Sequence, residues 1–187
     1  MSNSLILKYY VVVTMRELLD DTMAGWRKER PDLELDAMGT TLRLNLLINA
    51  ALRSAEALLA PHGITVGEFD VLAALRRGGN GAVLTPTTLA RVAMISPAGM
   101  TNRLDRLAAA GLIERRPDPD DRRGSLVRLT SAGHATADRA IDDLVAAENE
   151  FLRNLTRPEQ QHLDHLLDKL IDRDVPVRTE AAAPARH

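Results

Sequence analysis

Two copies of one helix-start signal stand close together and constrain the fold more than any other feature of the chain. The Thr-Pro pair at 85–86 and the Ser-Pro pair at 96–97 each place a hydroxyl that can cap a helix before a proline. Proline is favoured at the first helical position because its missing amide hydrogen has no partner there in any case. We expect helices near 86–93 and 97–110, and two helices this close in sequence form a helix-turn-helix.

A β-hairpin is predicted directly after the second helix. Gly111 ends that helix, and two short strand-like runs at 112–116 and 125–130 flank the polar, turn-rich loop 117–124. The order helix, helix, glycine, strand, arginine-bearing loop and strand is far more specific than a helix-turn-helix alone. It predicts a winged helix-turn-helix.

Charge is distributed unevenly along the chain. The segment from Thr85 to Thr130 holds eight arginines and five acidic residues, a net charge of +3, whereas the remainder carries −5. A basic middle in an acidic body is the asymmetry expected of a local nucleic-acid footprint.

The major groove admits an α-helix, so the start of the second helix is expected to face base edges, while arginines of the hairpin tip sense the minor groove. The predicted DNA-facing residues of the second helix are Ser96, Pro97, Ala98, Thr101, Asn102, Arg103 and Arg106, and those of the tip are Arg122 and Arg123. The alternative for each arginine is an ordinary solvated charge, with Arg115 and Arg116 paired to Asp118 or Asp120.

The rest of the chain predicts a mostly α fold. Aromatic residues make up only 3% of 187 residues, and the chain is rich in helix-favouring alanine, leucine and arginine. Further helices are expected over 15–30, over 40–59, after a capping box at Thr65 and Glu68, from a Ser131 cap to about Leu155, and after a second capping box at Thr156 and Glu159. In the first of these, Leu18, Leu19, Met23 and Trp26 lie near one face. The helix over 40–59 is so apolar that it should be buried over most of its circumference, with a partner subunit as one candidate neighbour.

Several functional classes find little support. The chain has no cysteine, which excludes disulfides, thiol nucleophiles and cysteine-ligated metals and fits a cytoplasmic protein. The apolar run at 5–15 is too short to cross a bilayer, so no membrane association is expected. No phosphate-binding loop or nucleophile elbow is present, and we expect neither enzyme activity nor a cofactor. His162 and His165 could share a metal on one helix face, although surface histidines are the simpler interpretation.

Three stretches resemble the MarR family of dimeric winged-helix regulators: 65–76, 96–113 and 117–130. The resemblance extends over about 36–174. It implies a homodimer made by the first and last helices, with two recognition helices in successive major grooves of a pseudo-palindromic double-stranded DNA operator. It also implies wing contacts through Asp121 and Arg123, with the aspartate orienting the arginine.

A narrower resemblance lies at 26–38, which is similar to the extra N-terminal helix of the PecS-like, urate-responsive subgroup. Four residues match the positions that this subgroup uses for its ligand: Trp26, Asp70, Arg103 and Arg115. The resemblance implies a small anionic effector, urate or a related purine, that stacks on the indole and releases the protein from DNA. Citrate-like carboxylates or phenolic compounds are alternative effectors, and a metal is a further one. The alternative role of the four side chains is packing, ion pairing or DNA contact alone.

The expected function is therefore a homodimeric, ligand-responsive transcriptional regulator, in this family most often a repressor. A non-DNA-binding dimer that antagonises another regulator would lack the arginine-bearing wing, which this sequence has. The predicted organisation is an N-terminal extension and extra helix at 1–38, a helical dimerisation region at 39–62 and 131–175, the winged domain at 63–130, and a disordered tail at 176–187.

Overall fold

The structure is a computed structural model that describes residues 14–79, 81–93, 95–119 and 124–172. The chain divides into two compact units, Met1–Ser54 and Ala55–His187. The predicted tail at 176–187 and the wing-tip residues Asp121, Arg122 and Arg123 lie outside the described residues. Among those described, no single helix is long and apolar enough to cross a membrane, although α2 with its 3-10 extension (Asp36–His62) and α3 (Val66–Arg77) pass that test as a bent pair.

The first unit contains α1 (Met15–Glu29) and most of α2 (Asp36–Leu59). Thr14 and Glu17 form a capping box that starts α1, and the predicted helix over 15–30 is confirmed. Leu19 and Met23 of α1 are buried with Leu35, and the near side of α2 packs on this small cluster. Of the predicted apolar face of α1, Leu18 and Trp26 remain about half exposed.

The predicted burial of the apolar helix over 40–59 is only partly reached within a single chain, and burial by a partner subunit stays a prediction. One side of α2 packs on the α1 cluster through Leu42 and Leu46. On the rest of its surface Leu47, Ile48 and Leu52 are 44%, 54% and 48% exposed. One neighbouring helix covers only one stripe of a helix, so a sequence that is apolar nearly all round keeps exposed leucines.

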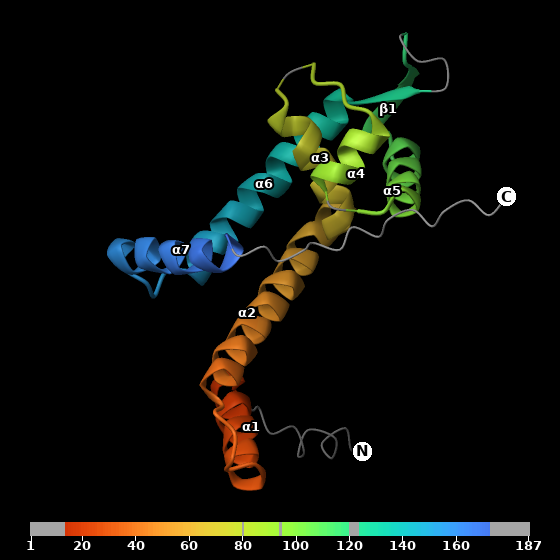
Figure 1. Cartoon of the computed structure of the whole chain (residues 1–187). Coiled ribbons are helices and arrows are strands. Elements are labelled where there is room, and N and C mark those ends of the chain that lie inside the picture. The colour runs from red at the N-terminus through yellow and green to blue at the C-terminus, as the bar shows by residue number, and fades with distance from the viewer. Residues whose placement is uncertain (1–13, 80, 94, 120–123, 173–187) are drawn as a thin grey trace, which may run out of the picture. The chain divides into compact units, whose positions relative to one another are not determined.

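The second unit contains five helices, a 3-10 turn and a two-stranded sheet among its described residues. They are η1 (Ala60–His62), α3 (Val66–Arg77), α4 (Pro86–Val92), α5 (Pro97–Ala109), β1 (Ile113–Pro117), β2 (Ser125–Leu129), α6 (Ser131–Phe151) and α7 (Arg157–Ile171). Figure 1 shows α3, α4 and α5 gathered beside the sheet, with α6 leading away to α7. Thr65, Thr85 and Ser96 cap α3, α4 and α5 with their side chains, which confirms the predicted helix starts.

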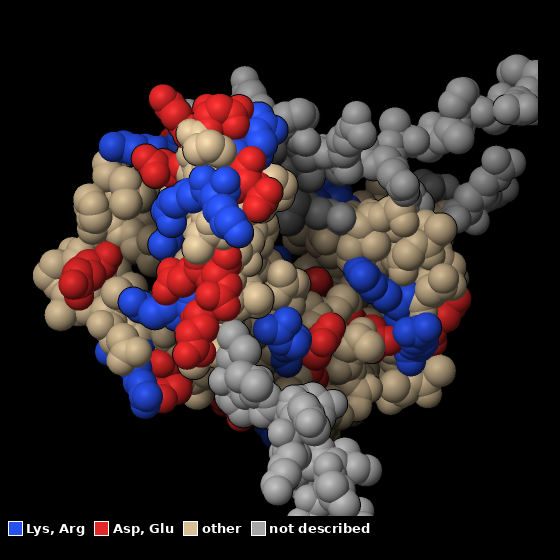
Figure 2. Space-filling model, turned by 90° about the horizontal axis from the view of Figure 1, so that it is seen from below, with Lys and Arg blue, Asp and Glu red and all other residues tan. Residues whose placement is uncertain are grey.

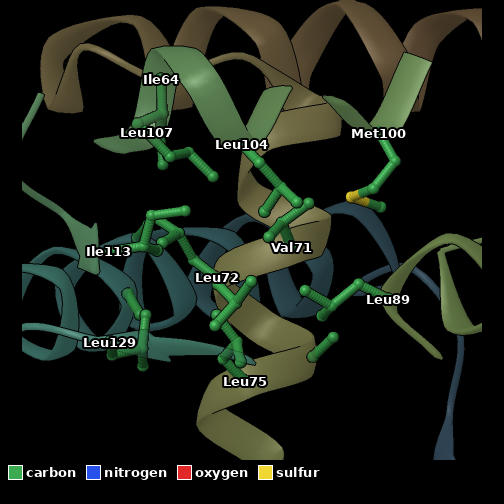
Figure 3. Packing of buried hydrophobic residues seen from close by; sticks show 14 of the residues in the cluster. Ile64, Val71, Leu72, Leu75, Leu89, Met100, Leu104, Leu107, Ile113 and Leu129 are labelled. Atoms are coloured by element: carbon green, nitrogen blue, oxygen red, sulfur yellow. The ribbon is translucent and has the colours of Figure 1, made fainter. Parts of the chain in front are cut away.

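A single hydrophobic core holds α3, α4, α5 and the sheet together (Figure 3). Met100, Leu104 and Leu107 of α5 are each 1% exposed, and Leu89 of α4 is fully buried against the same cluster. Val92, in the last turn of the short α4, is 43% exposed. On α3, Val71 and Ala74 are buried, whereas Phe69 and Ala73 are only partly so.

The predicted hairpin is confirmed as an antiparallel pair with Glu114 opposite Arg128. Leu84, before α4, adds a third short segment to the sheet because its amide and carbonyl pair with those of Val127 at 3.0 and 2.9 Å. This bridge ties the entry of the helix-turn-helix to the wing. Sequence periodicity gives no signal for a one-residue bridge.

The predicted bounds of the long helix need two corrections. The cap of α6 is Thr130 rather than Ser131, because Thr130 is extended and its hydroxyl accepts from the Gly133 amide at 3.0 Å. The helix ends at Phe151, four residues before the predicted end. The capping box at Thr156 and Glu159 starts α7 as predicted.

Candidate nucleic-acid interface

The second helix of the helix-turn-helix, α5, is fixed by its cap and by one apolar edge. The Ser96 hydroxyl accepts from the Gly99 amide at 3.3 Å, and Met100 and Leu104 anchor the helix in the core. Because the buried residues recur every three to four positions, the opposite face is presented to solvent. Thr101 and Asn102 lie on that exposed face in the first turns, together with the exposed cap Ser96, and Pro97 occupies the first helical position.

Arg106 extends this exposed face by one turn. Its side chain is 72% exposed, and its Nη1 lies 3.9 Å from a carboxylate oxygen of Glu68. That carboxylate is buried and already accepts the amide and hydroxyl of Thr65 in the α3 capping box. An exposed pair at this distance is weak, so the Arg106 guanidinium remains available to a phosphate or a base edge.

Arg103 does not lie on the exposed face, which corrects the prediction from sequence. Its side chain turns back toward the first turn of α3, where a Cβ placed on Gly67 would lie 2.4 Å from the guanidinium Cζ. The Nη1 atom of Arg103 is buried and has no hydrogen-bond partner within the described part of the chain. A buried unsatisfied cationic donor is costly and calls for a physical explanation.

Asp70 follows Gly67 by one turn on α3 and feels the same guanidinium. Partial burial raises the pKa of the Asp70 carboxyl above its usual range, while the positive charges of Arg103 and Arg77 act in the opposite direction. The described residues include no ion pair to Asp70 within 4.0 Å, so the structural salt bridge considered from sequence is not formed. Two of the four predicted ligand residues, Asp70 and Arg103, are thus brought into one electrostatic environment.

A pocket of about 540 Å³ adjoins Arg103. Its walls come from Glu56 and from residues between Ala60 and Gly67, the turn that leads into α3. Apolar side chains and bare backbone make up most of the lining, and Arg103 supplies a positive charge. Such a mostly apolar concavity with two charged groups of opposite sign, Glu56 and Arg103, has the character of a small-molecule site.

Arg115 and Arg116 at the start of the wing have partners that the sequence reasoning missed. Arg115 Nη2 lies 2.6 Å from Asp105 Oδ1, which joins the wing to α5. Glu114 pairs with Arg128 across the strands and with Arg116 Nη2 at 3.3 Å. Arg115 and Arg116 thus have acidic partners besides those expected from sequence; Asp120 lies outside the described residues, and pairing with Asp118 stays a prediction. The hairpin register could have indicated the Glu114 to Arg128 pair, since directly opposed residues interact.

Trp26, the fourth predicted ligand residue, lies on α1 in the first unit and its side chain is 45% exposed. It therefore is not a buried packing aromatic. The other three predicted ligand residues belong to the second unit. The four-residue ligand set stays a prediction.

The histidines considered as metal ligands are exposed on α7. Across the residues that the structure describes, no group of three or more His, Asp or Glu side chains could hold a metal ion. On the face shown in Figure 2, acidic and basic side chains are interspersed rather than gathered by sign. With a net charge of −2, the chain can contact a nucleic acid only through a local group of basic side chains.

A capped helix with one exposed polar face, preceded by a short helix at a fixed angle and followed by a charged hairpin, defines the winged helix-turn-helix class. A profile of the MarR family matches residues 62–124. The chain is 36% identical over 155 residues to the transcriptional regulator PecS of Dickeya dadantii, covering 81% of this chain and 92% of PecS. A transcriptional repressor of Mycobacterium tuberculosis is 34% identical over 124 residues, which covers 66% of this chain and 87% of the repressor. Among solved structures, an Escherichia coli MarR mutant complexed with operator DNA matches with a TM-score of 0.61 and 31% identity, covering 78% of this chain and 97% of MarR.

This chain belongs to the MarR family. Its relatives are transcriptional regulators rather than enzymes.

Proposed function

We propose that this protein is a homodimeric regulator, most simply a repressor, that binds a pseudo-palindromic operator and is released from it by a small anionic ligand. The observation that carries the proposal is the exposed polar face of α5, on which Thr101, Asn102 and Arg106 stand opposite a fully buried apolar edge. A helix held this firmly can present the same side chains to the major groove in every complex. The structure of a MarR relative with operator DNA supports this use of the fold.

The proposed DNA contacts divide by type. Asn102 is suited to a base edge, since an amide can pair with adenine in two places, and Ser96 and Thr101 offer hydroxyls to bases or phosphates. Arg106 serves a guanine or a phosphate. In the wing, Arg122 and Arg123 enter the minor groove, with Asp121 orienting Arg123. Phosphate contacts set position and salt dependence, whereas base contacts set sequence.

The first test is binding to the intergenic DNA beside the protein's own gene, by fluorescence anisotropy at several stated salt concentrations. Asn102→Ala should weaken operator binding by about 5- to 150-fold while leaving non-specific binding unchanged, which is the expected cost of a base contact. If Arg106 contacts a phosphate, Arg106→Ala should weaken all sequences alike and reduce the salt slope by about 1. Arg139→Ala, which removes an exposed arginine from α6, is the matched control.

The wing is tested separately with Arg123→Ala. Loss of a minor-groove contact should weaken operator binding at fixed salt while the dimer stays intact. An affinity equal to that of the wild type would mean that the wing does not read the operator.

The homodimer is supported by unpaired apolar surface. On α7, Leu166, Leu170 and Ile171 are 44%, 47% and 74% exposed, and α2 exposes Leu47, Ile48 and Leu52. Contiguous apolar faces on terminal helices are typical of association surfaces. Leu170→Arg should convert a species of twice the chain mass to a monomer in sedimentation equilibrium and abolish high-affinity operator binding. A variant that stays dimeric would remove α7 from the interface.

The effector is proposed to be urate or a related purine bound by Trp26, Asp70, Arg103 and Arg115. The buried, unpartnered nitrogen of Arg103 beside a largely apolar pocket supports a planar anion, and the similarity to PecS supports the subgroup. Operator release is measured with urate, xanthine, hypoxanthine and citrate. Release by citrate alone would indicate a carboxylate-responsive regulator instead. Tight operator binding that none of the four compounds changes would contradict the purine effector and leave the proposed DNA binding in place.

The role of Trp26 has its own variant. Trp26→Ala should bind operator normally and respond weakly to urate, because the stacking surface is lost while Arg103 remains. Unchanged release by urate would remove Trp26 from the ligand set.

A further inference from the structure

Gly67 occupies the second position of α3, directly under the side chain of Arg103. A Cβ built on Gly67 would lie 2.4, 2.5 and 2.6 Å from Arg103 Cζ, Nη2 and Nε. Three atoms of one plane at nearly equal distance mean that the guanidinium lies flat on the backbone of α3. No side chain at position 67 is compatible with this arrangement, because real Cβ atoms do not approach other atoms so closely.

The backbone itself gives no reason for a glycine here. Gly67 lies in a regular helix and is not among the glycines with positive φ, which are Gly63, Gly79, Gly81 and Gly111. Glycine inside a helix costs stability relative to alanine. Gly25 of α1 is the contrasting case, since an added Cβ there would meet nothing within 4 Å. At position 67 the glycine makes room for the arginine.

We propose that Gly67 is a positioning residue: it holds the Arg103 guanidinium flat at the wall of the 540 Å³ pocket and leaves the buried Nη1 atom unpartnered among the described residues, so that a planar anion that reaches it supplies the missing acceptor. The same contact joins the first turn of α3, which lines the pocket, to α5, which carries the DNA-facing side chains. Anion binding therefore acts on α5 through Gly67 and Arg103. This inference rests on the proposed function only where it concerns the effector.

The positioning contact itself is tested without any ligand, by a double-mutant cycle on thermal unfolding. Gly67→Ala should leave Tm about unchanged in the wild-type background, because displacing the far end of the flexible Arg103 side chain offsets the gain of alanine over glycine in a helix. In the Arg103→Ala background the same substitution should raise Tm by about 2 °C, because the methyl group enters vacated space and alanine favours the helix. Gly25→Ala is the control and should have the same effect in both backgrounds. An identical effect of Gly67→Ala in the two backgrounds would overturn the proposal.

The functional part is tested by titrating urate into the operator complex. Gly67→Ala should keep operator affinity within about threefold of the wild type, since Thr101, Asn102 and Arg106 keep their places on α5, while the urate concentration for half release rises tenfold or more. A purely structural glycine would lower operator affinity and leave the urate midpoint unchanged, which would overturn the positioning role. If urate fails to release the wild type, the proposed effector is wrong, and the unfolding cycle alone decides whether Gly67 positions Arg103.

Discussion

The solvent exposure of the ion pair between Asp105 of α5 and Arg115 of β1 determines how large an effect its removal should have. The two charged atoms are 2.6 Å apart, but the side chains are 60% and 32% exposed. Solvent screens such pairs, and measured coupling energies of exposed pairs are about 0.2–1 kcal/mol. Breaking the pair should therefore lower stability slightly. If it holds the wing against α5, it should also weaken operator binding by at most about fivefold, since 1.4 kcal/mol corresponds to tenfold.

The assay is a double-mutant cycle with Asp105→Asn, Arg115→Gln and the double variant, followed by urea unfolding and by operator binding at one salt concentration. Each single substitution also changes the charge near DNA, and the cycle removes that contribution because it appears in both legs. Glu150 and Arg153 at the end of α6 form the control pair, 2.5 Å apart and about two-thirds exposed. Their coupling should appear in unfolding and not in operator binding.

Additivity within about 0.3 kcal/mol in both measurements would refute the reasoning, because that is the behaviour of independent sites. Coupling in unfolding without coupling in DNA binding would keep the ion pair but remove its role in placing the wing. Strengthened coupling at high salt would also contradict a screened surface pair.

Three further predictions concern the core, a close backbone approach and pH. Leu104→Ala should lower the free energy of unfolding by about 3–5 kcal/mol in urea titration, because a side chain that is 1% exposed leaves a cavity that its neighbours cannot fill. Gly133→Ala should cost about 3 kcal/mol or more, because the new Cβ would meet the Leu112 carbonyl oxygen, a backbone atom that cannot turn aside; a smaller loss would mean that the start of α6 shifts freely. Burial raises the pKa of the Asp70 carboxyl, so the folded state binds the carboxyl proton more tightly than the unfolded state does. The stability that this group contributes is therefore present at low pH and is lost as pH rises through the raised pKa. Asp70→Asn should therefore raise Tm at neutral pH, and the gain should vanish as pH falls below the ordinary carboxyl range; a gain that does not depend on pH would have another origin.

Local signals in the sequence were sufficient for the helix starts and the hairpin. A hydroxyl before proline, or Thr followed three residues later by Glu, specifies a cap through atoms within one turn, and Thr65, Thr85 and Ser96 all cap as predicted. The misplaced cap of α6 has the same origin. Two adjacent hydroxyl residues compete for one role, and the extended conformation of Thr130 decides it.

Contacts between elements were beyond the sequence reasoning because they depend on how helices cross. Arg103 was expected to be exposed, since its position on α5 alone does not reveal that the first turn of α3 passes over it. Asp105 gave no signal for the same reason, as its partner lies ten residues away on a strand. The half-exposed leucines of α2 show the converse limit. An apolar sequence predicts that a surface will be covered, but not that the cover lies within the same chain.

Three charged side chains within one turn of α5 point in three different directions. Arg103 packs inward on α3 beside the pocket, Asp105 pairs with the wing, and Arg106 extends toward solvent. These side chains share a single rigid helix turn. If α5 rotates or slides when an anion binds at Arg103, Asp105, which pairs with the wing, and the side chain of Arg106 must move with it. A ligand alters DNA binding if its affinity differs between two positions of this helix. It shifts the equilibrium between the two positions by that difference in binding free energy and no more. Variants that free Arg103 from α3 should separate effector response from operator affinity, whereas variants of Asp105 should change both, because Asp105 holds Arg115, one of the proposed ligand residues.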